Sequence, residues 1–257
     1  MSMIKLNSEC LLGVNKAGTL KPDAQGWYDV ILGALEYPNS YGAVYKVDPV
    51  QQLLNGDSIF ARRIRKGCLI GEYGHPRQEP GESMAEFKRR VMSINEKFES
   101  HTIKEVVIDT SLKDAKGRRY IGIRGKVKPS GPYGQYLIEK FADPDMNVCF
   151  SVRSFTNDKF VNGRHEKYTT CIITWDFVGE PGLEKANKYN SPSLESYSMT
   201  IDPNELRDIA KAPVSMGFES SGVAAVAREV LSRSGLTVER QSGIEDSGSK
   251  AWHKRWK

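Results

Sequence analysis

The feature that most constrains the fold is a series of short apolar segments that follow one another closely between residues 28 and 178. Turn-forming residues bound each segment, a pattern typical of antiparallel sheets. We expect strands over residues 28–35, 68–72, 102–109, 120–128, 148–155 and 168–178. A charged turn around Gly117 separates the third and fourth segments, which indicates a hairpin. The sequence therefore predicts an α+β fold that is mainly an antiparallel β-barrel with peripheral helices.

Helices are expected at a few points around these strands. Ser83, with Glu86 three residues later, has the pattern of a capping box. An apolar stripe with helical spacing follows at Phe87, Val91, Ile94 and Phe98. The charged residues between them, at 88–90 and 96–97, are expected to face solvent. Shorter helical segments are predicted over 48–54 and 133–141.

The composition changes after about residue 186. Residues 187–198 are rich in Ser, Asn and Tyr and look like a linker, and short helices are expected over 205–212 and 222–232. From Gly235 onward Gly, Ser and charged residues dominate, so we expect disorder there. The predicted organisation is a β-barrel domain over 1–190, followed over 191–257 by a linker, short helices and a basic flexible tail.

Charge and apolar content narrow the functional classes. The chain of 257 residues has a net charge of +5, and four of its positive charges lie in the last eight residues. A nucleic-acid binder usually has a basic face on its folded body, so any such contact is expected only through the tail. The sequence has no apolar run of the ~18–20 residues that a membrane span needs. Because the first residues do not resemble a secretory signal, we expect a cytoplasmic protein without a membrane partner.

The cysteines predict neither disulfides nor a metal site. Cys10, Cys68, Cys149 and Cys171 have no paired spacing and no neighbouring His cluster, which excludes the usual zinc motifs. We interpret them as reduced, buried thiols. No phosphate-binding loop is present either, so no cofactor is predicted.

Three polar residues could carry chemistry. His75 lies between Gly74 and Pro76 just after a predicted strand, where a histidine is most often a surface residue. Ser151 lies within a strand whose alternation places it on one face with Arg153, a face open enough to hold an arginine. Asp176 interrupts an apolar strand, so it either faces solvent or has a specific partner such as an imidazole. Together these residue types could form a nucleophilic hydrolase, but spacing alone does not bring them together.

Several motifs resemble those of the tailed-phage prohead (capsid maturation) protease family. Gly71–Pro76 (GEYGHP) is similar to the family's histidine motif, which often reads GE-x-x-HP. Further similar segments follow in the family's order at residues 91–94, 101–103, 125–127, 134–138, 148–153 and 175–181. The likeness covers roughly residues 28–185. It implies a β-barrel ringed by helices, like the herpesvirus assemblin protease.

The resemblance also implies roles for individual residues. His75 would be the general base, Ser151 the nucleophile and Asp176 the acid that orients the histidine. His165 is the competing third member, because the assemblin relatives use a second histidine. Backbone N–H groups near Val152 and Arg153 would stabilise the oxyanion. The chain departs from the family here, since Val152 and Ser154 replace a frequent Ser and Gly around Arg153.

The implied activity is that of a serine endopeptidase in prohead maturation. It would act inside the prohead, within the cytoplasm of the bacterial host, on scaffold or core proteins and capsid proteins; homo-oligomer formation is left open. Members of the family cleave after Glu next to small residues. Such contexts in the C-terminal region make Glu219, Glu239 and Glu245 candidate sites of self-cleavage.

Two other functions remain open from the sequence. The first is a non-catalytic virion or scaffold-associated protein, whose basic tail, with Trp252 and Trp256, would bind scaffold or single-stranded nucleic acid. The second is a cysteine hydrolase that uses Cys149 with His75, because Cys149 shares a strand face with Ser151.

Overall fold

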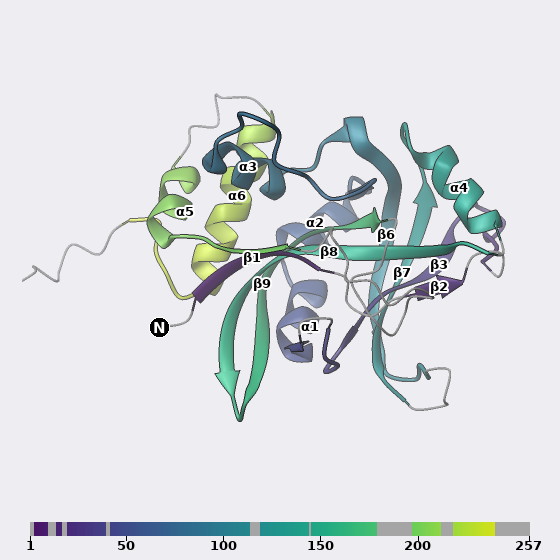
Figure 1. The fold of residues 1–257 in the computed structure, drawn as a ribbon, viewed down its shortest axis with the longest axis horizontal. Helices are drawn as coiled ribbons and strands as arrows, with labels where there is room; N and C mark the ends of the chain where they lie inside the picture. Colours follow the sequence, from purple (N-terminus) through teal and green to yellow (C-terminus); the bar gives the residue numbers. More distant parts are fainter. Residues whose placement is uncertain are drawn as a thin grey trace, which may run out of the picture.

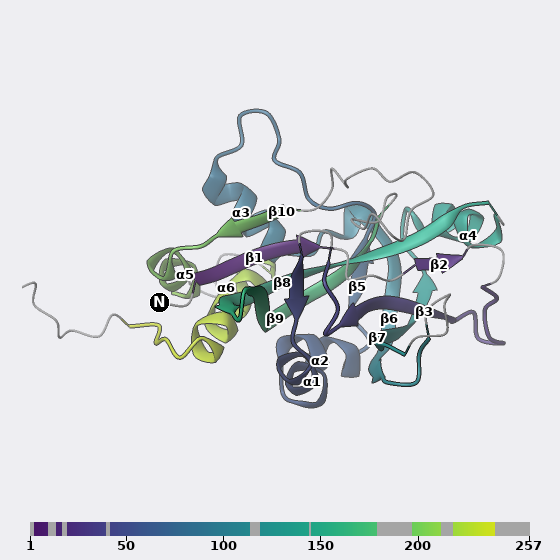
Figure 2. The same cartoon turned by 60° about the horizontal axis from the view of Figure 1, so that its bottom comes forward.

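The computed structural model describes residues 3–9, 14–16, 20–39, 42–113, 119–143, 145–178, 197–211 and 218–239. These residues form two β-sheets with helices around them (Figures 1 and 2). Helices α3, α5 and α6 gather at one end of the molecule and α4 lies at the other. No helix in the described part of the chain is long and apolar enough to cross a bilayer.

The larger sheet has the strand order β10-β1-β8-β9-β4, and β2 also pairs with β8. Its strands are β1 (Met3–Glu9), β2 (Val14–Lys16), β4 (Ala43–Tyr45), β8 (Asn147–Val161), β9 (Arg164–Val178) and β10 (Tyr197–Thr200). All of these pairs are antiparallel except the pair of β4 with β9. The β8–β9 hairpin lies at the centre of this sheet. Its register determines which residues of the two strands face each other.

The smaller sheet has the order β3-β7-β6-β5 and is antiparallel throughout. Its strands are β3 (Tyr28–Leu35), β5 (Ile70–Glu72), β6 (Glu99–Asp109) and β7 (Ile121–Pro129). The predicted hairpin of β6 and β7 is confirmed. Most other predicted strands are confirmed with shifted ends. Strands β1, β2, β4 and β10 were not expected, and β10 begins within the segment predicted as a linker.

The predicted closed barrel is wrong for the described residues, which form two separate sheets. The sheets meet where β5 runs beside β9, but that contact is an isolated bridge between Tyr73 and Phe177 rather than a ladder. Two features explain the gap. β5 is only three residues long, and Gly74 then adopts a positive φ of 71° that turns the chain away.

The hairpin of β8 and β9 is longer than predicted. A turn was expected over residues 157–164, but the strands continue to Val161 and resume at Arg164. Asn162 and Gly163 alone make the turn, both with positive φ. The extra length makes the hairpin project from the body of the molecule, and Phe160 near its tip is 73% exposed (Figure 1).

Seven helical segments flank the sheets in the described residues. They are α1 (Val47–Asn55), α2 (Ile59–Arg65), α3 (Met84–Met92), the short 3-10 helix η1 (Glu96–Phe98), α4 (Gly134–Ala142), α5 (Pro203–Ala210) and α6 (Phe218–Arg233). The helical predictions at α1, α4, α5 and α6 are confirmed. α2 was missed.

Helix α3 begins as predicted and ends early. The capping box of Ser83 and Glu86 is present. The helix stops at Met92, so the expected continuation through Phe98 is wrong, and Phe98 is exposed. The Ser93 hydroxyl donates to the carbonyl of Arg90 at 2.9 Å, and Arg153 binds the carbonyls of Val91 and Ser93. These contacts satisfy terminal carbonyls that would otherwise continue the helix.

Two hydrophobic clusters make the core. One lies between the sheets and includes Phe60, Phe150 and Trp175. The other lies against β1, β8 and β9 and joins them to α3, α5 and α6 through residues such as Phe155 and Val226. Parts of the segment expected to be a linker and tail are therefore packed into the core. The predicted boundary at residue 190 stays a prediction, and residues 240–257 lie outside the described part.

Candidate active site

The turn that follows β5 places His75. At Gly71 a Cβ atom would collide with the His101 ring and the carbonyl of Trp175, so only glycine lets β5 approach β9 this closely. The Gly74 amide then donates to the carbonyl of Phe177 at 2.8 Å, and the positive φ of Gly74 reverses the chain. His75 is thereby brought beside β9 and is buried, although its position suggested a surface residue.

Asp176 on β9 is fully buried and is the partner of this histidine. Its Oδ2 lies 2.9 Å from Nδ1 of His75, and its Oδ1 accepts a hydrogen bond from the Glu72 amide at 3.1 Å. Burial alone would raise the pKa of Asp176. The Arg153 guanidinium and the His75 hydrogen bond outweigh burial and hold this pKa below its usual value. Asp176 is therefore an ionised acceptor, which makes Nδ1 of His75 the donor.

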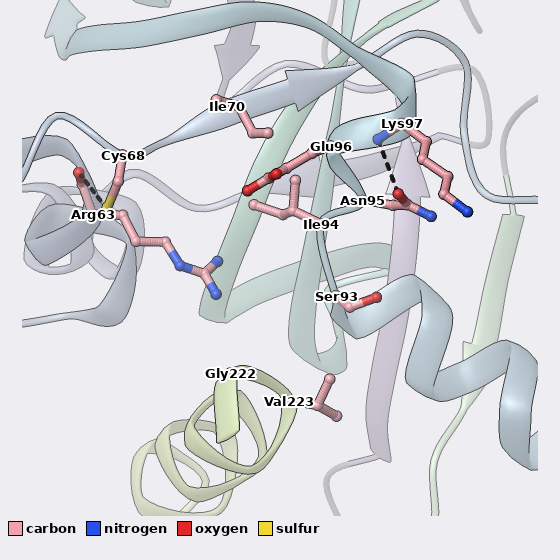
Figure 3. Close-up of a pocket in the computed structure, with 10 residues that line it drawn as sticks. All are labelled: Arg63, Cys68, Ile70, Ser93, Ile94, Asn95, Glu96, Lys97, Gly222 and Val223. Carbon is pink, nitrogen blue, oxygen red and sulfur yellow. Dashed lines mark hydrogen bonds between the residues drawn. The ribbon is translucent and has the colours of Figure 1, made fainter. Parts of the chain in front are cut away.

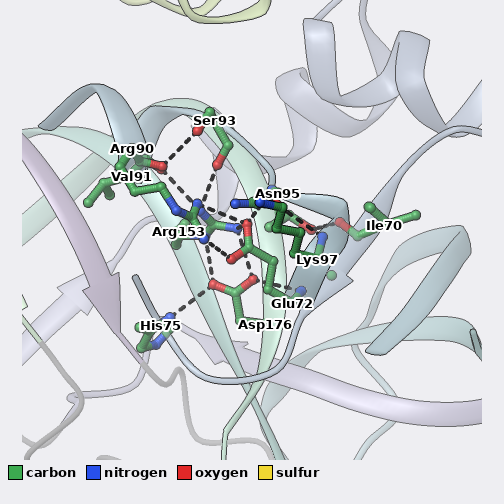
Figure 4. A network of polar contacts seen from close by, with 12 residues as sticks. Ile70, Glu72, His75, Arg90, Val91, Ser93, Asn95, Lys97, Arg153 and Asp176 are labelled. Carbon is green, nitrogen blue, oxygen red and sulfur yellow. Dashed lines mark hydrogen bonds and ion pairs between the residues drawn. The ribbon is translucent and has the colours of Figure 1, made fainter. Parts of the chain in front are cut away.

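Arg153 on β8 holds Asp176 from the other side (Figure 4). Its Nε lies 2.6 Å from Oδ2 of Asp176, and its Nη2 contacts Oδ1 of Asp176 and Oε1 of Glu72. Its Nη1 donates to the carbonyls of Val91 and Ser93. Arg153 is 0% exposed, so the expectation that its strand face is open is wrong. The 91–95 segment covers that face and supplies the acceptors that a buried guanidinium needs.

Glu72 completes the buried group of charges. Besides Arg153, it pairs with Arg90 on α3 at 2.5 Å and accepts a hydrogen bond from the Asn95 amide at 2.8 Å. Arg90 was expected to face solvent, but its guanidinium turns inward to this carboxylate. We call Glu72, Arg90, Arg153 and Asp176 the ionic network. It ties α3 and β5 to the two strands that carry Ser151 and Asp176.

Ser151 lies directly opposite Asp176 in the β8–β9 ladder. Opposite residues of an antiparallel pair have Cβ atoms about 4.5–5.5 Å apart and project from the same face of the sheet. Ser151 is buried, and its hydroxyl has no hydrogen-bond partner among the described residues. The three residues singled out from the sequence thus come together: Asp176 bonds to His75 and faces Ser151.

The other predicted site residues have different surroundings. Val152 and Arg153 each pair with both β1 and β9. Backbone N–H groups at such positions normally donate hydrogen bonds to the neighbouring strands. Their predicted oxyanion role stays a prediction, and the Arg153 side chain instead holds the acid. Cys149 is buried two residues from Ser151, and its alternative role also remains a prediction. Cys68 is exposed rather than buried.

His165 lies far from this site. It is half exposed near the tip of the β8–β9 hairpin, opposite Phe160. Nine residues of strand separate Phe160 from Ser151, roughly 30 Å at about 3.3 Å per residue. His165 therefore cannot contact His75 in this structure.

The candidate self-cleavage sites fall in three settings. Glu219 lies in the first turn of α6. Glu239 is exposed at the end of the described chain, and Glu245 is outside the described residues.

Sequence reasoning missed two residues of the site, Glu72 and Arg90. A signal for each was present. Glu72 is an acid in a short apolar strand, as Asp176 is. Arg90 lies three positions after Phe87, so it borders the apolar stripe of α3 and can reach inward.

Three comparisons relate the chain to known proteins. A model of the Peptidase S80 family matches residues 6–246. The chain is 38% identical over 235 residues to the capsid maturation protease of Pseudomonas phage phiKZ, and the match covers 88% of this chain and 86% of that protein. A solved structure, the capsid assembly protease gp21 of bacteriophage T4, aligns with 68% of this chain and 98% of its own, at a TM-score of 0.45 and 12% identity.

Proposed function

The chain belongs to the Peptidase S80 family, and we propose that it is a serine endopeptidase of phage prohead maturation with Ser151 as its nucleophile. His75 is the general base and Asp176 the acid that orients it. The observation that carries this proposal is the 2.9 Å contact between His75 and Asp176 on the strand directly opposite Ser151. The similarity to a phage capsid maturation protease supports the same function.

The geometry supports the following sequence of steps. Asp176 accepts a hydrogen bond from the Nδ1–H of His75, which leaves Nε2 as the basic nitrogen. Nε2 removes the Ser151 proton as Oγ attacks the scissile carbonyl carbon, and Asp176 stabilises the imidazolium that forms. The imidazolium then gives this proton to the leaving amine. Water attacks the acyl-enzyme by the same route, and this step releases the acid product and restores Ser151.

In the unliganded chain the Ser151 hydroxyl makes no hydrogen bond to any described residue. The mechanism requires it to bond to Nε2 of His75 when substrate is bound. Catalytic hydrogen bonds commonly tighten at that stage. The buried hydroxyls of Ser154, Thr169 and Thr170 likewise have no partner among the described residues, so the feature that distinguishes Ser151 is its position opposite Asp176.

The proposed substrates are scaffold or core proteins and capsid proteins inside the prohead, cleaved after Glu. The chain's own C-terminal region is a further substrate. Of its candidate sites, Glu239 is exposed and outside any helix, so a protease could bind it in an extended form. Glu219 lies in α6 and would need local unfolding first.

The test is proteolysis of purified scaffold protein by the wild-type chain and three single variants. Ser151→Ala should reduce cleavage below detection, because removal of a triad nucleophile typically lowers kcat by about 10⁶-fold. Ser154→Ala is the matched control, since Ser154 lies on the same strand and is also buried with an unpaired hydroxyl. It should cleave like wild type.

The third variant, Cys149→Ala, tests the cysteine mechanism. Cleavage that is lost in Cys149→Ala and retained in Ser151→Ala would replace the serine mechanism with the cysteine one. An inactive wild type that binds nucleic acid in a salt-dependent way would favour the non-catalytic function. Intact masses of the same samples report self-cleavage, and a Ser151→Ala chain shortened like wild type would exclude it.

A further inference from the structure

A cavity of about 530 Å³ lies between α2, β5, the 93–97 segment and α6 (Figure 3). Its lining includes Arg63, Ile70, Ile94, Lys97 and Val223. His75, Ser151 and Asp176 are not among the lining residues. The cavity is therefore distinct from the proposed active site, and a ligand bound there need not be a substrate of the protease.

Arg63 points its guanidinium into this cavity (Figure 3). Among the described residues, Nη1 is buried without a hydrogen-bond partner. The charge of the Glu229 carboxylate opposes the effect of burial on the pKa of Arg63, but Glu229 pairs with Arg233 and the Ile59 amide rather than with Arg63. Nη2 faces Gly222 of α6. A Cβ atom added at Gly222 would lie 3.8 Å from Nη2, so the two are not in close contact. Burial also lowers the pKa of Arg63, which reflects the loss of water around the charge. An arginine stays protonated in proteins, so this charge lacks the partner that a buried cation needs.

The charges around the cavity indicate which anion would fit. Arg63 and Lys97 are positive and Glu96 is negative, so the lining has a net charge of +1. This balance suits a carboxylate, with one negative charge, better than a phosphate with nearly two. The guanidinium fork also matches the two oxygens of a carboxylate.

The apolar part of the lining indicates what the carboxylate belongs to. Ile70, Ile94 and Val223 surround the space beside Arg63. The volume lies within the usual range of ligand pockets and exceeds what one carboxylate fills. We propose that this cavity binds a peptide segment whose Glu or Asp side chain pairs with Arg63 while a neighbouring apolar side chain packs on the isoleucines.

The wall of the cavity is shared with the ionic network. The carbonyl of Ser93 binds Arg153, and the amide of Asn95 binds Glu72. Both residues also line the cavity. A bound peptide would therefore contact the segment that holds the network in place.

The proposal is tested by fluorescence anisotropy on the full chain, with Ser151→Ala as background so that no peptide is cleaved. The probe is a labelled six-residue peptide with Ile-Glu-Val at its centre, and its partner probe carries Gln in place of Glu. Arg63→Gln should weaken binding of the Glu probe at least about 10-fold, a typical loss for one charge-assisted pair. The Gln probe should bind the parent chain as weakly.

Arg62→Gln is the matched control, because Arg62 is the preceding residue on α2 and lies at the surface near Asp57. It should bind the Glu probe like the parent, and equal melting temperatures of the variants would show that the fold is intact. Equal affinity for the two probes, an unchanged affinity in Arg63→Gln, or no binding at millimolar peptide would each overturn the proposal. Displacement of the Glu probe by inorganic phosphate at lower concentration than by unlabelled Glu peptide would also overturn it, in favour of a phosphate site.

Discussion

Arg153 and Arg63 are two guanidinium groups removed from water in contrasting ways. Arg153 is fully buried and binds Asp176, Glu72 and two backbone carbonyls. Arg63 lines an open cavity, and its buried Nη1 binds none of the described residues. Both guanidinium groups stay charged. The fold neutralises the charge of Arg153 with carboxylates, and among the described residues it supplies no such partner to Arg63. The first arginine is part of the internal structure, and the second is available for a ligand.

Arg153 also keeps the acid of the proposed active site ionised. A buried carboxylate would normally take up a proton, and Asp176 would then no longer orient His75 as an ionised acceptor. Arg153 prevents this, and Glu72 in turn balances the extra positive charge of Arg153. The proposed catalytic acid is therefore maintained by side chains outside the proposed triad. Among the described residues, Arg63 has no comparable pair of carboxylates.

The largest expected effect comes from removing the paired arginine. Arg153→Met should lower the free energy of unfolding by about 3–5 kcal/mol, because it leaves Asp176 and Glu72 buried with one partner fewer. Cleavage activity should fall with it, since Asp176 loses the cation that keeps its pKa low. Urea denaturation of the purified variant measures the first effect. The variant Arg90→Met removes a partner of Glu72 from the more exposed edge and should cost less.

A loss below about 1 kcal/mol in Arg153→Met would contradict this account. It would mean that the ionic network adds little to the free energy of unfolding. Arg153 and Arg63 would then not differ in how much they stabilise the fold.

The sequence was most informative where a local pattern carries a geometric requirement. The GEYGHP segment is one case: Gly71 allows close approach to β9, Gly74 supplies the turn, and His75 follows at the point where it meets Asp176. Asp176 is another, because a carboxylate in an apolar strand demands a partner. The role of His75 came from the resemblance of this segment to a protease family, whereas general chemistry drew attention to Asp176 and left a solvent-facing carboxylate as the alternative.

The sequence was least informative where distant segments cover one another. The open face expected for Arg153 is buried because residues 91–95, some 60 positions earlier in the chain, lie over it. Strand alternation describes one strand and carries no information about such a cover. The closed barrel failed for a similar reason, since closure depends on pairing between β5 and β9, which the spacing of strands does not determine.

A buried histidine provides an intermediate case between the two arginines. His101 is fully buried beside Phe150, and burial lowers its pKa from 6.5 to about 4, although the charge of Asp176 opposes the shift. Unlike an arginine, it can remain neutral in the fold. Between pH 6.5 and about 4 the unfolded chain binds a proton at this residue and the folded chain does not, so stability should fall as the pH falls. The loss over that window is about 3 kcal/mol.

Urea denaturation at pH 7 and pH 4.5 measures this loss. The variant His101→Gln should lose clearly less stability between the two pH values than wild type. His165→Gln, which removes a half-exposed histidine near the hairpin tip, is the control for the loss of an imidazole. Identical pH dependence in wild type and His101→Gln would show that His101 is charged in the fold or already exposed. Asp176 has a pKa below its usual value of 3.8 in the folded chain. Its contribution to stability is therefore lost only as the pH falls below that value, outside the window in which His101 acts.

The smallest effect is expected at Arg63, and its sign is the informative part. Replacing Arg63 by Met removes a half-buried charge that has no partner among the described residues and keeps most of the apolar stem that packs along the helix. We expect the free energy of unfolding to stay level or rise by about 1 kcal/mol, whereas most substitutions at half-buried positions lower it. The same denaturation series that tests Arg153→Met provides the measurement.

A drop of about 2 kcal/mol or more in Arg63→Met would reveal that Arg63 already stabilises the fold, and a ligand would not be needed to explain why a charge is placed there. A level or raised stability would instead indicate that the chain tolerates an unpaired cation for the sake of binding, since functional sites commonly sacrifice stability in this way.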